Sequence, residues 1–100
     1  MNIKVIHEEG TTQMLMSGTI DIPSAESLKK SLHAVLETEP KNVVLDFNEV
    51  ESIGSSGIGA LLLSHKEFTS RGITFDVINI NKEITALFRI IKLDKLFKID

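Results

Sequence analysis

The sequence predicts an α/β fold with a mixed, mostly parallel central sheet of about five strands and helices packed against it. The stretch Val43–Phe47 is nearly continuous in apolar residues, which is typical of a strand covered on both faces. From Ser55 onward, apolar residues recur at steps of three and four, which is typical of one face of a helix. Strands and helices alternate in this way along most of the chain, and such an order requires crossover connections between parallel strands.

The composition fits one domain over residues 1–100, because 42% of the residues are hydrophobic and 25% are charged. The formal net charge of -3 offers no broad positive field to a phosphate backbone, so we expect no nucleic-acid partner. The chain has no cysteine, which excludes thiolate metal ligands, and we expect neither a metal nor a cofactor. The apolar runs are too short for a bilayer span and no hydrophobic block follows Met1–Lys4, so we expect a cytoplasmic protein without membrane insertion.

The N-terminal part of the chain predicts a hairpin followed by a helix. Apolar residues at Ile3 and Val5 and at Met14–Met16 flank the turn-prone stretch Glu8–Thr12, and Gly18 is expected to end the second strand. The helix should begin with Asp21 or Ser24 as its N-cap and Pro23 in its first turn, and it should stop before Pro40. Its apolar stripe consists of Leu28, Leu32, Val35 and Leu36.

The rest of the chain predicts two more helices and two more strands. The helix that starts near Ser55 should end at Arg71–Gly72, since glycine is the common left-handed terminator, and a strand should follow over Ile73–Ile80. Asn81 is expected to cap the last helix, and a turn at Leu93–Leu96 should lead into a short edge strand, Phe97–Ile99. The apolar stripes of the two helices are Ile58, Leu61, Leu62 and Phe68, and Ile84, Leu87, Phe88, Ile90 and Ile91.

The turn Gly54–Gly57 places two serines at a helix start, and three enzyme interpretations of it fail. A hydrolase nucleophile elbow around Ser56 needs a glycine where Ile58 stands, and His65 lies roughly 13 Å further along the same helix. A dinucleotide site lacks its third glycine because position 62 is Leu, and a P-loop lacks its lysine because position 60 is Ala. We instead expect Gly57 and Gly59 to let the first helical turn approach the sheet, His65 to be packed and His33 to be exposed.

Two interpretations of the serines remain open from residue chemistry. A phosphoryl group here would meet free backbone N–H groups, and its added charge would disturb any partner docked on the same helix end. Alternatively, Ser55 is only the N-cap and Ser56 a small first-turn residue, each stabilising the helix by roughly 1 kcal/mol or less. From the residue chemistry alone, the capping interpretation is the simpler one.

The same stretch resembles the core of STAS domains, particularly the small bacterial anti-sigma-factor antagonists. The resemblance rests on Val43–Phe47 with Val50 and on Ile53–Gly59, of which Ser-Ser-Gly-x-Gly is the most specific part. Gly18–Asp21 matches the family's Gly-x-x-Asp after the second strand, and Leu87-Phe88 with Leu93–Ile99 matches its C-terminal portion.

The resemblance implies a partner-switching module without catalytic activity. The unmodified form would bind an anti-sigma factor that is also an ATP-dependent serine protein kinase, and would thereby free the sigma factor. Phosphorylation of Ser55 would release the complex, and a serine phosphatase would restore it. This raises phosphorylation of Ser55 above the capping interpretation.

Carried over by motif position, Asp21 corresponds to the acidic residue near the phosphoacceptor, and Ser56, Gly57 and Gly59 correspond to helix-start positions. One departure is Gly54, where the family usually has Asp. We expect a partner-binding surface made of Asp21, Ile22, Gly54, Ser55, Ser56, Gly57 and Ile58. Two alternatives are a STAS subunit of a transport or sensory assembly without a phosphate switch and, more weakly, a nucleotide or small-molecule binder.

Overall fold

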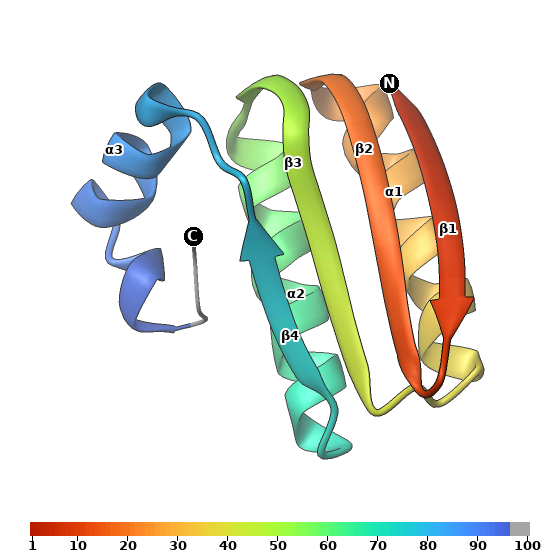
Figure 1. Cartoon of the computed structure of the whole chain (residues 1–100). Coiled ribbons are helices and arrows are strands. Elements are labelled where there is room, and N and C mark those ends of the chain that lie inside the picture. The colour runs from red at the N-terminus through yellow and green to blue at the C-terminus, as the bar shows by residue number, and fades with distance from the viewer. Residues whose placement is uncertain (97–100) are drawn as a thin grey trace.

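The computed structural model describes residues 1–96 and shows a mixed four-stranded sheet in the order β1-β2-β3-β4 (Figure 1). β1 pairs antiparallel with β2, whereas β2–β3 and β3–β4 are parallel. The elements are β1 (Asn2–Glu8), β2 (Thr11–Ile20), α1 (Ile22–Glu37), β3 (Asn42–Ile53), α2 (Ser55–Ser70), β4 (Thr74–Ile78), α3 (Lys82–Ile90) and a 3₁₀ turn η1 (Leu93–Lys95). The predicted mixed, mostly parallel α/β fold is therefore confirmed. The expected fifth strand, Phe97–Ile99, lies outside the described residues.

Helices α1 and α2 cover the same face of the sheet, and α3 lies beside the β4 edge (Figure 1). The side chains between helices and sheet form one core, of which the largest fully buried members are Phe47, Phe68, Phe88, Met14, Ile20, Leu28, Leu32, Leu36, Leu45, Leu61, Val43 and Val77. The prediction that β3 is covered on both faces was wrong, because the two long helices lie on one face only. Val43 and Leu45 point into the core, while Val44 between them is half-buried.

Several predicted boundaries shift because strands continue through irregularities. β2 does not end at Gly18: this residue takes a left-handed φ of 98°, and the strand continues to Ile20 past two shifts in its register with β3. β3 likewise continues to Ile53, well beyond the apolar run. β4 ends at Ile78 instead of Ile80, because Asn79 takes a positive φ of 58° and turns the chain.

Most residues of the predicted apolar helix stripes are buried, but some are exposed. On α2, Leu61 is buried but Leu62 is 37% exposed, because neighbouring helical positions point about 100° apart. On α3, Ile84 and Phe88 are buried, whereas Ile90 is 77% exposed, because it lies two positions after Phe88 and so points about 200° away from it. Ile91 is also exposed, since it is the C-cap residue beyond the end of the helix.

The predicted caps are largely confirmed. Asp21 is the N-cap of α1 and accepts a hydrogen bond from the Ser24 N–H at 3.1 Å, with Pro23 in the first turn. Asn81 caps α3 by accepting from the Ile84 N–H at 2.8 Å. Its amide nitrogen donates to the carbonyls of Val50 and Glu51, which ties the start of α3 to the end of β3. Gly72 ends α2 with a φ of 76°.

Candidate functional site

All three α-helices of residues 1–96 begin at the same end of the sheet, namely the end at which the parallel strands finish (Figure 1). Ile20 at the end of β2 lies opposite Ile53 at the end of β3. The Gly54 N–H donates to the Ile20 carbonyl at 2.9 Å, so the link between β3 and α2 is bonded to the link between β2 and α1. The sheet register therefore brings Asp21 next to the Gly54–Ser55 turn.

Ser55 is exposed and is the first residue of α2. The N-cap is Gly54, and no side chain provides a capping hydrogen bond. The interpretation of Ser55 as the N-cap is therefore wrong, because the backbone is already helical at this serine and the residue that flanks the helix is the glycine before it. Within residues 1–96 the Ser55 hydroxyl makes no hydrogen bond, so it is available to another molecule.

The backbone at the start of α2 suits a negatively charged group. The first hydrogen bond of the helix runs from the Ile58 N–H to the Gly54 carbonyl at 3.0 Å. The N–H groups of Ser55, Ser56 and Gly57 have no intrahelical partner, as at every helix start. The first turn contains no acidic residue, so the positive end of the helix dipole is not neutralised from within the helix.

Gly57 sets the distance between α2 and the sheet. A Cβ atom at this position would lie 2.6 Å from Cγ2 of Ile20 and 2.7 Å from Cγ1 of Ile53, which confirms the expected close approach. A Cβ atom at Gly59 would have no neighbour within 4 Å, so the same expectation was wrong for Gly59. Gly57 is buried, so its role is to position the turn, and the accessible part of the turn is Gly54 and Ser55, with Ser56 half-buried.

Asp21 places a negative charge beside this turn. Hydrogen bonds from the Ser24 side chain and backbone N–H lower the pKa of the exposed Asp21 carboxyl below its ordinary value. The carboxylate is therefore ionised at neutral pH. A partner that binds here meets a fixed anion as well as the Ser55 hydroxyl.

Apolar side chains also lie at the starts of α1 and α2. Ile22, the first residue of α1, is 70% exposed, and Ile58 is half-buried against the core. The exposed Leu62 lies on the same side of α2 as Ser55 and Ile58, since these positions are spaced by three and four residues. The helical spacing in the sequence could have identified Leu62 as part of this surface.

Two further hydroxyls near the turn were missed by sequence analysis. The exposed Ser52 of β3 donates to the exposed Thr19 of β2 at 3.3 Å, one step before the strands end. They meet because the register shifts by one residue between Gly18 and Thr19. Nothing in the local sequence signals this shift.

His65 does not serve as a catalytic partner for Ser55 or Ser56. This residue is half-buried, and its ring packs edge-on against Phe75 with ring centroids 5.9 Å apart, as expected for a packed histidine. The exposed His33 lies on α1, 3.3 Å from the Glu37 carboxylate, which confirms that expectation too. Within residues 1–96 no group of His, Asp and Glu side chains has the arrangement of a metal site.

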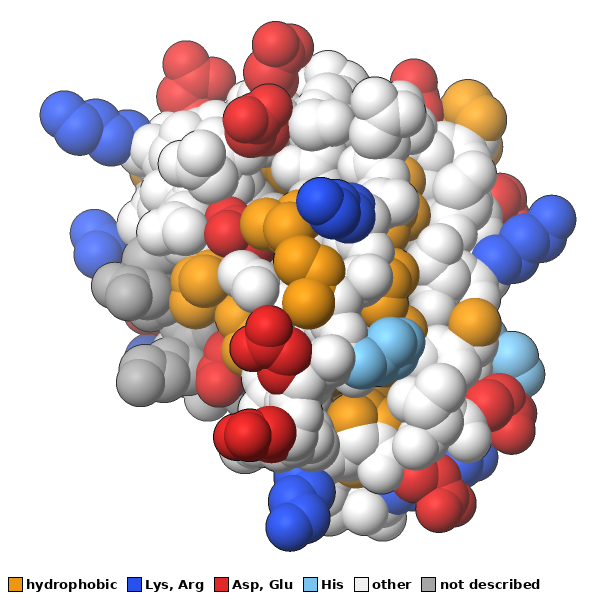
Figure 2. Space-filling view, turned by 45° about the vertical axis from the view of Figure 1, so that its right-hand side comes forward, with side chains coloured by type: hydrophobic (Ala, Val, Ile, Leu, Met, Phe, Trp, Pro, Cys, Tyr) orange, Lys and Arg blue, Asp and Glu red, His pale blue; other side chains and the backbone are white. Residues whose placement is uncertain are grey.

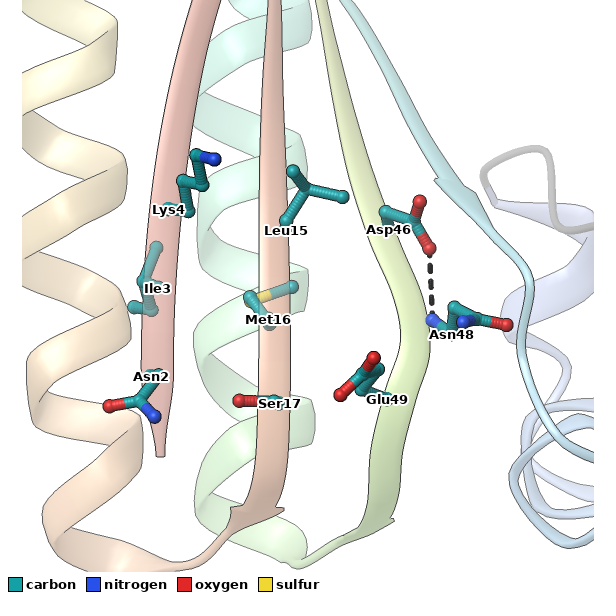
Figure 3. A pocket seen from close by; sticks show the side chains of 9 residues that line it. All are labelled: Asn2, Ile3, Lys4, Leu15, Met16, Ser17, Asp46, Asn48 and Glu49. Carbon is teal, nitrogen blue, oxygen red and sulfur yellow. Dashed lines mark hydrogen bonds between the residues drawn. The ribbon is translucent and has the colours of Figure 1, made fainter.

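A groove of about 350 Å³ lies on the sheet face that the helices leave open (Figure 3). Its lining residues are Asn2, Ile3, Lys4, Leu15, Met16, Ser17, Asp46, Asn48 and Glu49. Asp46 is held at its wall by hydrogen bonds from the Asn48 N–H at 2.9 Å and the Asn79 amide at 3.1 Å. None of the predicted site residues lines this groove, so the glycine-serine turn is not part of this hollow.

The family model of the STAS domain matches residues 2–100. The chain belongs to the STAS domain family. None of the helices within residues 1–96 is long and apolar enough to cross a membrane. The sequence resemblance on Val43–Phe47 and Ile53–Gly59 is thereby confirmed at the level of the family.

Several proteins similar to this STAS domain are named as anti-sigma factor antagonists. The anti-sigma-F factor antagonist RsfB of Mycobacterium tuberculosis is 24% identical over 99 residues, which are 99% of this chain and 80% of RsfB. The crystal structure of an anti-sigma factor antagonist from Mycobacterium paratuberculosis has a TM-score of 0.89 at 26% identity, over 98% of this chain and 83% of that chain. The Bacillus cell fate determinant SpoIIAA in its phosphorylated form has a TM-score of 0.77, over 99% and 91% of the two chains, and at 15% identity this likeness concerns the fold alone.

Replacing Gly54 with Asp should stabilise this STAS domain. Gly54 has an extended backbone (φ -94°, ψ 178°), and a Cβ atom would lie at an ordinary 3.7 Å from the Ile20 carbonyl. The introduced carboxylate would accept from the free N–H groups of α2, so Gly54→Asp should raise the free energy of unfolding by a few tenths of a kcal/mol. Urea unfolding measures this change. Gly54→Ala is the control without a capping group, and equal stability of the two variants would contradict the prediction.

Proposed function

We propose that this STAS domain is a cytoplasmic bacterial anti-sigma-factor antagonist that acts by partner switching and has no catalytic activity of its own. The unphosphorylated protein binds an anti-sigma factor that is also a serine protein kinase, and this binding frees the sigma factor. Phosphorylation at Ser55 abolishes binding, and a serine phosphatase that acts on phosphorylated Ser55 restores it. The partner-binding surface consists of Asp21, Ile22, Gly54, Ser55, Ser56, Gly57 and Ile58, in which the buried Gly57 positions the turn.

The observation that carries this proposal is the exposed Ser55 hydroxyl. It makes no hydrogen bond within residues 1–96 and lies at a helix start that no side chain caps. A kinase needs an accessible acceptor, and a phosphoserine needs donors that tolerate about -1.5 to -2 charges. The free N–H groups of Ser55, Ser56 and Gly57 supply such donors. The names of the similar antagonists from Mycobacterium tuberculosis and Mycobacterium paratuberculosis support the same role.

The switch then follows from electrostatics at the docking surface. In the unmodified protein the partner covers a neutral hydroxyl next to the exposed apolar side chain of Ile22. A phosphate on Ser55 adds charge beside the Asp21 carboxylate, and this charge has to be desolvated or repelled when the partner docks. The fold tolerates the phosphate, whereas the complex does not.

Phosphate incorporation tests the acceptor assignment. The protein is incubated with ATP and an anti-sigma-factor kinase from the same organism, and intact-protein mass spectrometry counts the phosphates added. We expect one phosphate on the wild type and on Ser56→Ala, and none on Ser55→Ala, because Ser56 is half-buried and Ser55 is exposed. Phosphorylation of Ser55→Ala, or its loss in Ser56→Ala, would overturn the assignment.

A further inference from the structure

The outer edge of β1 is a regular strand edge that no element of residues 1–96 covers (Figure 1). β1 pairs with β2 over its whole length of 7 residues without a register shift. Its sequence, Asn2–Glu8, contains none of the proline, glycine or bulge positions that commonly protect an edge strand from pairing. The edge is therefore competent to pair with another strand.

The hairpin turn determines which backbone groups point outward. Glu9 and Gly10 form a two-residue loop with φ values of 45° and 85°, as in a type I′ turn. In such a hairpin Glu8 and Thr11 form a hydrogen-bonded pair, and the hydrogen-bonded pairs then alternate along the ladder. The even-numbered residues of β1 thus bond to β2, while Ile3, Val5 and His7 direct their N–H and C=O groups to the free edge.

The side chains of β1 carry opposite charges on one face. Lys4, Ile6 and Glu8 alternate with the helix-facing residues, so they share the open face of the sheet. Both Lys4 and Glu8 are exposed, and neither forms an ion pair within residues 1–96. Figure 2, which brings the right-hand side of Figure 1 forward, shows hydrophobic side chains gathered in the middle of this side and acidic ones mostly toward its rim.

The other side of the strand is open to close approach. Val5 is 39% exposed and lines a hollow against α1 together with Ser31, Ala34 and Val35. The side chains of α1 at this hollow are small, so they do not prevent another chain from lying along β1. Pairing at the edge would also shield Val5 from water.

We propose that β1 pairs antiparallel with β1 of a second copy of this chain, with Ile6 opposite Ile6 of the second copy. The backbone groups that point outward belong to odd-numbered residues, so odd-numbered residues of one copy must lie opposite odd-numbered residues of the other. Three registers with long overlap satisfy this condition. The register centred on Lys4 puts Lys4 opposite Lys4, and the register centred on Val5 puts Lys4 opposite Ile6. The register centred on Ile6 alone puts each Lys4 opposite Glu8 of the other copy, and opposite charges in facing positions stabilise a pair of strands.

The dimer joins the two sheets of the copies into one and leaves the Ser55 turn free. β1 and β3 are separated by β2, and the turn lies at the end of β3. The inference is therefore independent of the proposed partner switch. The overlap of Lys4–Glu8 is short, so we expect a weak dimer that dissociates on dilution and in high salt.

Charge reversal and its complementation test this register. Sedimentation equilibrium measures the dimer constant of the wild type, of Lys4→Glu and of Glu8→Lys, with circular dichroism as the check of folding. In a dimer of either variant, both facing pairs of residues 4 and 8 carry like charges. Each reversal should therefore weaken the dimer about tenfold or more. An equimolar mixture of Lys4→Glu and Glu8→Lys should dimerise at least as well as the wild type, because every facing pair is again oppositely charged.

Val5→Pro tests the edge itself. It removes an outward N–H that the β1–β2 ladder does not use, so the fold should persist while the dimer is lost. A wild type that stays monomeric up to about 1 mM would overturn the proposal. A dimer that resists Val5→Pro would also overturn it, as would single reversals that are not rescued by mixing.

Discussion

Gly57→Ala is expected to destabilise the protein by about 2 kcal/mol, although the change adds a single methyl group. The new Cβ atom would lie 2.6 Å from Cγ2 of Ile20 and 2.7 Å from Cγ1 of Ile53, well inside van der Waals contact. Both isoleucines are buried in the core and cannot move aside freely. The helix start has to shift away from the strand ends, which displaces Ser55 from its place beside Asp21.

Gly59→Ala is the matched control, since both glycines lie in the first turns of α2. The Gly59 position is exposed and a Cβ atom there meets nothing within 4 Å. Alanine should therefore stabilise the helix by up to about 1 kcal/mol through its better propensity. Thermal unfolding should show a lower Tm for Gly57→Ala, by roughly 10 °C, and a higher Tm for Gly59→Ala. Two changes of the same sign would contradict the packing argument.

Ser55→Asp should weaken partner binding by more than about a hundredfold, which corresponds to about 3 kcal/mol. The carboxylate imitates part of the phosphate charge at the centre of the proposed docking surface. Ser55 is exposed and its hydroxyl makes no hydrogen bond within residues 1–96, so the substitution removes no hydrogen bond of the fold. An acidic residue at a helix start should leave the free energy of unfolding equal or slightly higher.

Ser55→Ala separates the effect of added charge on partner binding from the effect of losing the hydroxyl. It removes the acceptor hydroxyl without adding charge, and should retain the partner at close to wild-type affinity. A pulldown from host lysate with the three baits identifies the partner, and titration with the purified partner gives the affinities. If Ser55→Ala weakened binding as much as Ser55→Asp, the hydroxyl itself would be the contact, and the electrostatic switch would be wrong.

The features that the sequence predicted well are those that a few adjacent residues determine. The starts of two helices are examples, because capping depends on residues close together in the sequence. Asp21, followed by Pro23, caps α1 and Asn81 caps α3, both as predicted. Gly57 was predicted to allow close packing because a helix follows a strand within a few residues. Gly54 was overlooked as the N-cap, since a glycine has no side chain that announces the role.

The features that the sequence could not predict depend on residues far apart in the chain. β3 is longer than its apolar run because its pairing with β2 passes through two irregularities. The pair of Ser52 and Thr19 beside the turn results from one of these register shifts. Leu62 was assigned to the buried stripe because apolar character alone does not tell a core residue from an exposed one.

The most direct test of the partner switch compares the unmodified protein with the same protein phosphorylated stoichiometrically on Ser55. Calorimetric titration with the purified anti-sigma-factor kinase measures both affinities, while circular dichroism verifies that both forms are folded. We expect a well-defined complex for the unmodified form and an affinity lower by more than about a hundredfold for the phosphorylated form. Equal affinities would contradict the switch, and would favour a STAS subunit that binds its partner constitutively.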